Sequence, residues 1–285
     1  MASMRDIKRR KSSVQSTQQI TKAMKLVSTV KLQRARADAE RSKAYFECMY
    51  STVHSILARA GSVDHKYLKE AESQKKAVIV ITSNRGLAGG YNSNLVKLVK
   101  NQEGFDRDNV LIYAIGNKGK DALAKDGYEI RMDLPEVMEA PCYRDAMHLC
   151  DELLKAFEEG EIGEIYLAYT AFKNTVSHVP TLLKLLPVQA QELTEDEENR
   201  ALMNFEAEEE EALNMLIPKY ITSLIYGGLV EALASENGAR MQAMDNATSN
   251  AEEMISDLTL KYNRARQGSI TQELTEIIAG AEAIS

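Results

Sequence analysis

The 285-residue sequence has no tryptophan, only five prolines, and 6% aromatic residues. Sheets are usually rich in aromatic and β-branched residues, whereas helix interiors exclude proline. The longest apolar-rich stretches, residues 77–82 and 182–187, are far shorter than the roughly 18 residues that a membrane-spanning helix needs. The composition therefore predicts a helix-rich, soluble protein that does not cross a membrane.

Cysteine and histidine are also scarce, at three and four residues. The cysteines are not in CxxC spacing, and their odd number does not suggest a disulfide framework. No serine or cysteine lies in a recognisable nucleophile motif, and the acidic residues cluster in runs typical of a surface. We therefore expect no catalytic residues, no metal site and no cofactor.

Basic residues gather at the beginning of the chain, although the net charge is −7. Residues 1–36 contain ten basic residues and one acidic residue, but no aromatic residue precedes Tyr45. A single-stranded nucleic acid is usually bound by basic and aromatic side chains together. We therefore expect no nucleic-acid partner, and a coiled-coil adaptor or nucleic-acid binder remains only an alternative.

Glycine and proline are missing from residues 1–60, and proline is missing from residues 219–285. Both segments predict long helices. In the N-terminal helix, a narrow apolar face is predicted from Ile20, Ala23, Met24, Val27 and Val30. This width is typical of a coiled coil.

The C-terminal segment has a seven-residue repeat typical of a two-helix seam. The repeat consists of Met244, Ala251, Leu258 and Ala265, with Ala247, Met254 or Ile255, and Tyr262 between them. Residues 219–285 carry nine acidic and five basic residues, which complements the basic N-terminal helix. We therefore predict a long antiparallel coiled coil of the N- and C-terminal helices.

The middle of the chain alternates between strand and helix patterns. Strands are predicted at residues 75–84, 109–116 and 164–172, and helices at 93–102 and 117–127. This order is typical of a mainly parallel sheet, so we predict a central Rossmann-like α/β domain. The predicted divisions are residues 1–60, 75–190 and 207–285, and the acidic stretch 194–212 is predicted to form a solvated loop.

A glycine-rich stretch, NRGLAGGYN at residues 84–92, follows the first predicted strand. Such loops bind phosphate when their backbone N–H groups point at it. The spacing here is G-x-x-G-G, and no acidic residue ends the next strand. A tight structural turn is the favoured interpretation, and a Rossmann-like dinucleotide-binding protein with helical extensions remains an alternative.

The end of the chain carries an apolar stripe at helical spacing. It consists of Ile270, Leu274, Ile277, Ala281 and Ile284. The sequence pattern provides no partner segment for this stripe. We therefore expect another protein chain to cover it.

Three stretches resemble one known family. They are RDIKRRKSSVQSTQQITKAMKLVSTVKLQRA at the beginning, ITSNRGLAGGYNSN after the first strand, and NRARQGSITQELTEIIAGAEA at the end. In this order they are similar to the gamma subunit of the bacterial rotary F-type ATP synthase. The resemblance implies a non-catalytic central rotor shaft that couples ion translocation through the membrane c ring to ATP synthesis or hydrolysis at beta subunits.

The resemblance also implies the partners and the location. The partners are the hexameric ring of alpha and beta subunits, the epsilon subunit and the c-subunit ring, and the location is the cytoplasmic face of the plasma membrane. Membrane association is expected through the complex only. The apolar stripe is then a bearing inside the ring, since an apolar contact has no directional bonds to break.

Coupling contacts to beta are implied for polar and flanking residues of both helices. These are Lys22, Met24, Lys25, Arg240, Arg266, Gln267, Thr271, Glu273 and Thr275. Contacts with the c ring are implied for Met203, Phe205 and Glu206, where the sequence has an acidic run in place of the tyrosines common in the family.

Overall fold

The two segments without proline form the longest helices of the protein. The computed structural model describes residues 4–59, 65–69, 71, 73–175, 177–188 and 209–282. Helix α1 spans Met4–Arg59 and helix α6 spans Glu209–Glu282. Both predicted helices are therefore confirmed over these bounds.

Helix α6 begins within the acidic stretch that was predicted to form a loop. Residues 209–212, which were assigned to a solvated acidic loop, are helical. Acidic side chains are favourable in the first turn of a helix because they interact with its positive end. The rest of the predicted loop, residues 194–208, lies outside the described residues.

The shorter elements lie between these helices in sequence. They are β1 (Lys76–Ile81), α2 (Tyr91–Lys100), β2 (Val110–Ile115), α3 (Asn117–Lys125), β3 (Glu129–Asp133), the 3₁₀ turn η1 (Pro135–Met138), α4 (Tyr143–Glu158), β4 (Glu164–Phe172) and β5 (His178–Leu186). The predicted strands and helices of the middle segment correspond to β1, α2, β2, α3 and β4. Strands β3 and β5 and helix α4 were not predicted.

The five strands form one mixed sheet in the order β3-β2-β1-β4-β5. The first four strands are parallel, and β5 is antiparallel to β4. The predicted mainly parallel sheet is confirmed. Strand β1 lies in the centre, and all its residues from Ala77 to Ile81 are buried.

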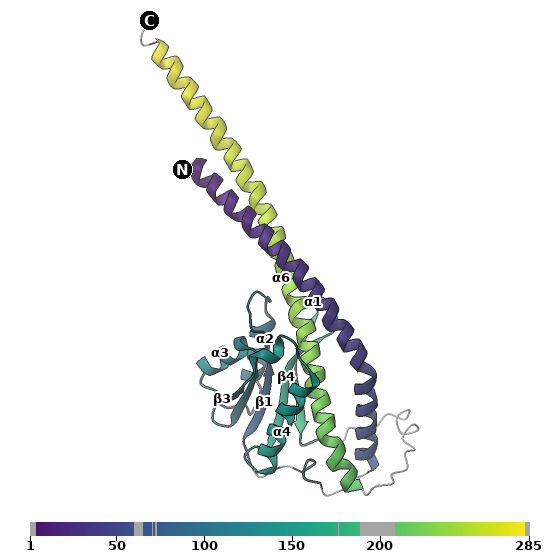
Figure 1. Ribbon diagram of the computed structural model, residues 1–285. Helices are drawn as coiled ribbons and strands as arrows, with labels where there is room; N and C mark the ends of the chain where they lie inside the picture. The colour runs from purple at the N-terminus through teal and green to yellow at the C-terminus, as the bar shows by residue number, and fades with distance from the viewer. Residues whose placement is uncertain are drawn as a thin grey trace. The chain divides into compact units, whose positions relative to one another are not determined.

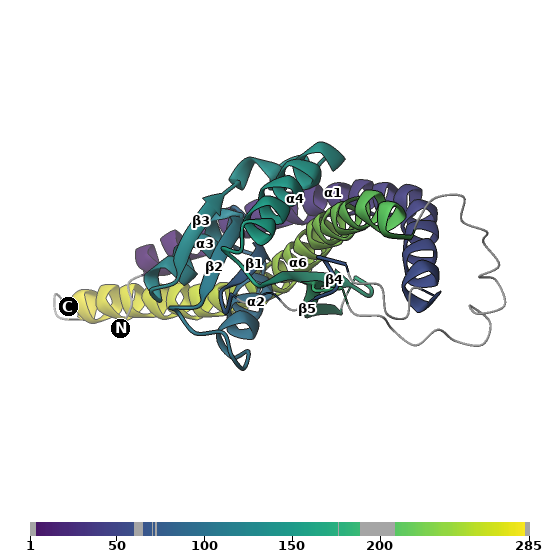
Figure 2. The same cartoon turned by 90° about the horizontal axis from the view of Figure 1, so that it is seen from below.

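Helices cover both faces of this sheet (Figures 1 and 2). On one face, Val78 and Val80 pack with apolar residues of α2 and α3. On the other face, Ile79 and Ile81 pack with α4 and with residues 213–232 of α6. Alternate side chains of the buried strand β1 thus point to opposite faces of the sheet and contribute to two cores, one on each side.

The chain divides into two compact units, and the division falls inside both long helices. One unit is Met1–Ser28 with Arg240–Ser285, and the other is Thr29–Ala239. We call the described residues of the first, 4–28 and 240–282, the helix pair, and the second the α/β unit. In the helices that the structure describes, no segment is both long and apolar enough to cross a bilayer.

Candidate functional site

The helix pair is antiparallel, as three contacts between side chains show. Gln18 Nε2 donates a hydrogen bond to Glu252 Oε1 at 3.0 Å, and Lys25 Nζ lies 2.6 Å from Asp245 Oδ1. Between them, the hydroxyl oxygens of Thr21 and Thr248 are 2.8 Å apart. Since rising numbers on α1 meet falling numbers on α6, the predicted antiparallel pairing is confirmed.

The contact surface between α1 and α6, the seam, is formed on both helices by residues at the spacing typical of a coiled coil. The least exposed residues of α1 include Ile7, Lys11, Val14, Gln18, Thr21, Lys25 and Ser28, at steps of four and three. On α6 the matching residues are Met244, Thr248, Ala251, Ile255, Leu258, Tyr262 and Ala265. The predicted seven-residue repeat of Met244, Ala251, Leu258 and Ala265 is confirmed, with Ile255 rather than Met254 at the ambiguous position. Thr248, and not the predicted Ala247, is the buried seam residue between Met244 and Ala251.

The predicted apolar face of α1 is wrong as a seam. Ile20 and Val27 are 60% and 58% exposed, Ala23 is also exposed, and in the α/β unit Val30 is 49% exposed. Met24 is half-buried, and the buried positions of the seam on α1 are the polar residues Thr21 and Ser28. The Thr21 hydroxyl donates to the backbone oxygen of Gln18 at 3.0 Å. Hydrophobic spacing alone does not reveal which face meets the partner helix when that face is polar.

The last part of α6 exposes its apolar stripe. Ile270, Leu274 and Ile277 are exposed, as is Ala281, and every residue from Ile270 to Ala281 is exposed. Figure 1 shows this end of α6 continuing past the beginning of α1. Within the helix pair, no other described segment covers the stripe. Ile284, predicted to complete it, lies outside the described residues.

Polar residues of the same segment bond within their own helix. Thr271 and Thr275 donate hydrogen bonds to the backbone oxygens of Gln267 and Thr271, at 2.9 and 2.8 Å. Ser269 donates to Glu273 at 3.3 Å. These local bonds leave the helix intact while the side chains remain at the surface, so the segment is a single exposed helix with apolar and polar faces.

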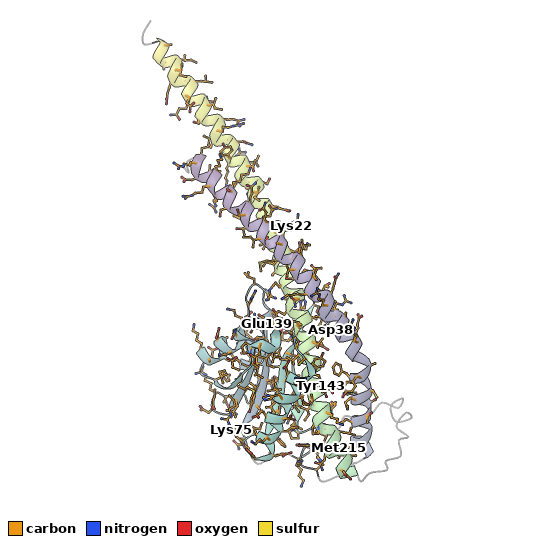
Figure 3. The ribbon with its side chains drawn as sticks, in the orientation of Figure 1. Lys22, Asp38, Lys75, Glu139, Tyr143 and Met215 are labelled. Atoms are coloured by element: carbon orange, nitrogen blue, oxygen red, sulfur yellow. The ribbon has the colours of Figure 1, made fainter. Side chains whose placement is uncertain are left out.

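The predicted coupling residues fall into two groups in the helix pair. The first group is on the paired part: Lys22 is exposed (Figure 3), while Met24, Lys25 and Arg240 are half-buried. The second group, Arg266, Gln267, Thr271, Glu273 and Thr275, is exposed near or on the single-helix end. The structure therefore does not gather these residues into one cluster. The predicted c-ring residues Met203, Phe205 and Glu206 lie outside the described residues.

Exposed apolar residues that the sequence analysis missed lie beside the predicted ones. Ile278 is 60% exposed next to Ile277, and Leu26 is 62% exposed on α1. In the α/β unit, Leu87 is exposed and has a φ of 65°, which is strained for a residue with a side chain. Two sequence signals could have identified these exposed residues. Ile278 and Leu26 are apolar residues on otherwise polar helix faces, and Leu87 is a leucine in a glycine-rich loop.

The glycine-rich loop is closed by its own hydrogen bonds. The Ser83 backbone N–H donates to Asn92 Oδ1 at 2.9 Å, and the Ser83 hydroxyl donates to the backbone oxygen of Arg85 at 2.6 Å. At the beginning of α2, the Tyr91 N–H, one of the groups that a phosphate would need there, donates to the backbone oxygen of Ala88 at 3.2 Å. The geometry favours the structural turn over a nucleotide site.

Helix α6 also occupies the place where a Rossmann-like sheet binds its cofactor. Strand β1 has β2 on one side and β4 on the other, which is the switch point of such a sheet. At the loop that follows β1, the Tyr91 hydroxyl donates a hydrogen bond to the backbone oxygen of Ala232 on α6, at 3.2 Å. The dinucleotide-binding alternative is therefore disfavoured.

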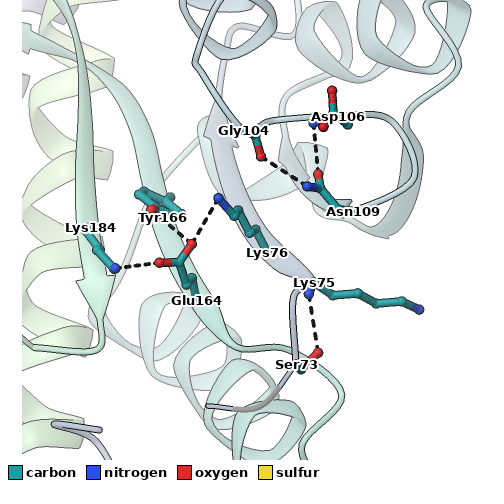
Figure 4. Close-up of polar contacts among 9 residues, drawn as sticks. All are labelled: Ser73, Lys75, Lys76, Gly104, Asp106, Asn109, Glu164, Tyr166 and Lys184. Atoms are coloured by element: carbon teal, nitrogen blue, oxygen red, sulfur yellow. Dashed lines mark hydrogen bonds and ion pairs between the residues drawn. The ribbon is translucent and has the colours of Figure 1, made fainter. Parts of the chain in front are cut away.

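A polar cluster at the opposite end of the strands has a structural role (Figure 4). Glu164 on β4 accepts hydrogen bonds from Lys184 Nζ at 2.6 Å and from Tyr166 at 3.2 Å, and Lys76 Nζ lies 3.2 Å away. Burial opposes ionisation of Glu164, but the two lysines hold the pKa of its carboxyl below its usual value. The cluster joins β1, β4 and β5.

Comparison with known proteins gives consistent results over the whole length. A family model described as ATP synthase matches residues 3–284. The ATP synthase gamma chain of Lachnoclostridium phytofermentans is 65% identical over 292 residues, covering 100% of both chains. That of Alkaliphilus metalliredigens is 43% identical over 285 residues, covering 99% of this chain and 98% of the relative.

The fold is also similar to a solved structure. A chain of the Euglena gracilis mitochondrial ATP synthase, in a complex described as OSCP/F1/c-ring, has a TM-score of 0.69. The match covers 99% of this chain and 94% of that chain, at 19% sequence identity. At this identity the likeness supports the arrangement of helices and sheet alone.

Proposed function

Because the chain belongs to the ATP synthase gamma-chain family, we propose that it is the central rotor shaft of an F-type ATP synthase. As a non-catalytic subunit, it couples ion translocation through the membrane c ring to ATP synthesis or hydrolysis at beta subunits. The observation that carries this proposal is the helix pair that ends in one exposed, partly apolar helix. Such a surface requires a partner.

The apolar end of α6 is suited to a bearing. Ile270, Leu274 and Ile277 present large apolar side chains that are 49–68% exposed. Because only about half to two thirds of each side chain is still exposed, burying it in a surrounding collar favours assembly by roughly 1 kcal/mol per side chain. Because apolar contacts have no directional bonds, rotation within the collar breaks none. We propose that Ala281 and Ile284 extend this bearing.

Coupling requires contacts that depend on the rotation angle. Charged and hydroxyl side chains supply them, since a charge-assisted hydrogen bond is worth about 1.5–3 kcal/mol and is directional. We assign this role to Lys22, Lys25, Arg240, Arg266, Gln267, Thr271, Glu273 and Thr275, and an apolar contact with beta beside them to Met24. Support comes from exposure of most of these residues on the helix pair. Lys25 would have to exchange Asp245 for a partner on beta.

The exposed apolar face of α1 adds a second contact surface to this proposal. Ile20, Leu26 and Val27 expose more than half of their surface, although the seam beside them is polar. A helix in isolation would gain stability by turning these residues inward. We propose that they face the ring of alpha and beta subunits.

The partners follow from the proposed role. The Euglena structure is described as containing F1 and a c ring, and we infer corresponding partners here: alpha, beta and epsilon subunits and a c-subunit ring. Met203, Phe205 and Glu206 are proposed as the c-ring contacts. In the proposed division, residues 1–60 and 207–285 form the shaft, and 75–190 form the α/β domain. The chain would be peripheral on the cytoplasmic face of the plasma membrane.

Reconstitution tests this proposal. The purified chain should hydrolyse no ATP, and its addition to an alpha–beta ring should restore rotation of a label fixed to the α/β unit. A matched control is the chain shortened after Ala265, which lacks the bearing and the second coupling group. ATP hydrolysis by the chain alone, or equal rotation with the shortened chain, would contradict the proposal.

A further inference from the structure

A cavity of about 150 Å³ lies in the α/β unit between α1, α6 and strands β4 and β5. Its described lining is mostly aromatic and aliphatic. It includes Phe46, Tyr50, Tyr169, Tyr220, Gly227 and the acidic residue Glu231. An engineered apolar cavity of similar volume holds a benzene molecule. The space is therefore large enough for one small ring.

A glycine in the middle of α6 keeps this space open. A Cβ atom built on Gly227 would lie 3.7 Å from the ring of Phe46, which is ordinary contact and not a clash. Glycine in a helix interior costs about 0.5–1 kcal/mol relative to alanine. The fold therefore has room for an alanine that would stabilise the helix, and that alanine would occupy the side of the cavity facing Phe46.

The cavity walls suit a positively charged ligand. Tyr50 and Tyr220 have ring centres 6.4 Å apart, and Phe46 and Tyr169 provide further rings at the cavity. Burial raises the pKa of Tyr169 and Tyr220 to about 12, so both hydroxyls remain neutral at physiological pH. Aromatic faces attract cations through their negative quadrupole, most strongly where water is excluded.

Among the described residues that line the cavity, Glu231 is the one with a charged side chain. Burial raises the pKa of its carboxyl, and the backbone N–H of Phe172 is the group that opposes this rise. Within the part of the chain that the structure describes, no lysine or arginine forms an ion pair with Glu231. A partly buried carboxylate gains most from a cation that enters the same space.

We propose that this cavity binds a small organic cation, an amine or amidine with a ring-sized apolar body. The ring would lie among Phe46, Tyr50 and Tyr220, and the charged nitrogen would lie against the Glu231 carboxylate. Tyr50, which is 37% exposed, lies where the cavity reaches the surface. This site goes beyond the rotor function and does not depend on it.

Titration of the full chain with three ligands of one shape tests the charge requirement. The ligands are benzylammonium, benzyl alcohol and benzoate. Binding is measured at neutral pH by calorimetry or by ligand-observed NMR. Benzylammonium should bind at least tenfold more tightly than benzyl alcohol, and benzoate should show no binding. Equal affinity for the amine and the alcohol, or no binding of the amine at millimolar concentration, would overturn the proposal.

Two variants separate the ligand site from the stability of the fold. Gly227→Ala should abolish binding of the amine while the melting temperature stays equal or rises, and Gly280→Ala, at a position with open space around it, is the matched control that should bind normally. Glu231→Gln should reduce the preference for the amine over the alcohol to less than about threefold. A preference that survives in Glu231→Gln, or tight binding by Gly227→Ala, would show that the assigned residues do not form the site.

Discussion

The α/β unit and the helix pair distribute their apolar residues in opposite ways. In the α/β unit, Ile79 and Ile112 are fully buried between layers of the fold. In the helix pair, Ile20 and Ile277 expose 60% and 68% of their surface, and hydroxyl groups occupy part of the seam. The α/β unit is thus complete by its own packing, whereas the helix pair presents a surface that suits a surrounding partner.

Removing one core side chain should have the largest effect on the free chain. Ile79→Ala should destabilise the α/β unit by about 4 kcal/mol, because a cavity forms on the central strand. Hydrogen exchange of the β1 and β2 amides in increasing urea measures this loss. Ile277→Ala is the control and should change stability by less than about 0.5 kcal/mol. Similar losses in both variants would remove the contrast between the two regions.

Deleting residues 276–285, which leaves every proposed coupling residue in place, should affect assembly more than the chain itself. Loss of Ile277 and Ile278 removes apolar surface worth on the order of 2 kcal/mol to the complex, about thirtyfold in affinity for an alpha–beta ring. Binding assays measure the affinity, and the coupling ratio of assembled complexes should change little. Full assembly without coupling would contradict the bearing.

Glu164→Gln should lower the free energy of unfolding of the α/β unit by a smaller amount, about 1–2 kcal/mol, because Lys76 and Lys184 would no longer share a carboxylate. The depressed pKa of Glu164 means that its stabilisation is present above the ordinary glutamate pKa and lost as pH falls through the folded value. Urea unfolding between about pH 5 and pH 3 should therefore show a flatter acid dependence in the variant. Glu139→Gln, at an exposed position, should retain the original dependence.

The smallest effect is expected at the polar seam. Thr21→Val or Thr248→Val alone should cost about 1 kcal/mol, since each leaves one hydroxyl without its partner across the seam. The double variant should recover most of this loss, because two methyl groups then meet. Hydrogen exchange of the α6 amides near residue 248 measures the coupling between the sites. Strictly additive losses would show that the hydroxyl contact contributes nothing.

Sequence patterns predicted the buried strands well and the edge strands poorly. Strands β1 and β2 are continuous apolar runs because helices cover both of their faces. Strand β3 is an edge strand with charged residues, and β5 contains Pro180 and is half-buried over most of its length. Edge strands tolerate both features, and they therefore lack the apolar signal that identified the central strands.

Candidate site residues were predicted with uneven success for a related reason. The exposed stripe Ile270, Leu274 and Ile277 was found from its spacing, and its exposure is confirmed. The α1 seam was missed because Thr21 and Ser28 carry no hydrophobic signal, while Ile20 and Val27 do. The roles of the coupling and c-ring residues remain predictions.

The sequence by itself determined the two long helices, the central strands and the family, because helix-breaking residues, apolar runs and long shared stretches are local properties of the chain. Only the tertiary structure decided which side chains of α1 meet α6, and that α6 covers the switch point of the sheet. Those outcomes depend on close packing between segments some 140 or more residues apart, as in the contact of Tyr91 with Ala232. Such contacts leave no periodic signal in either segment.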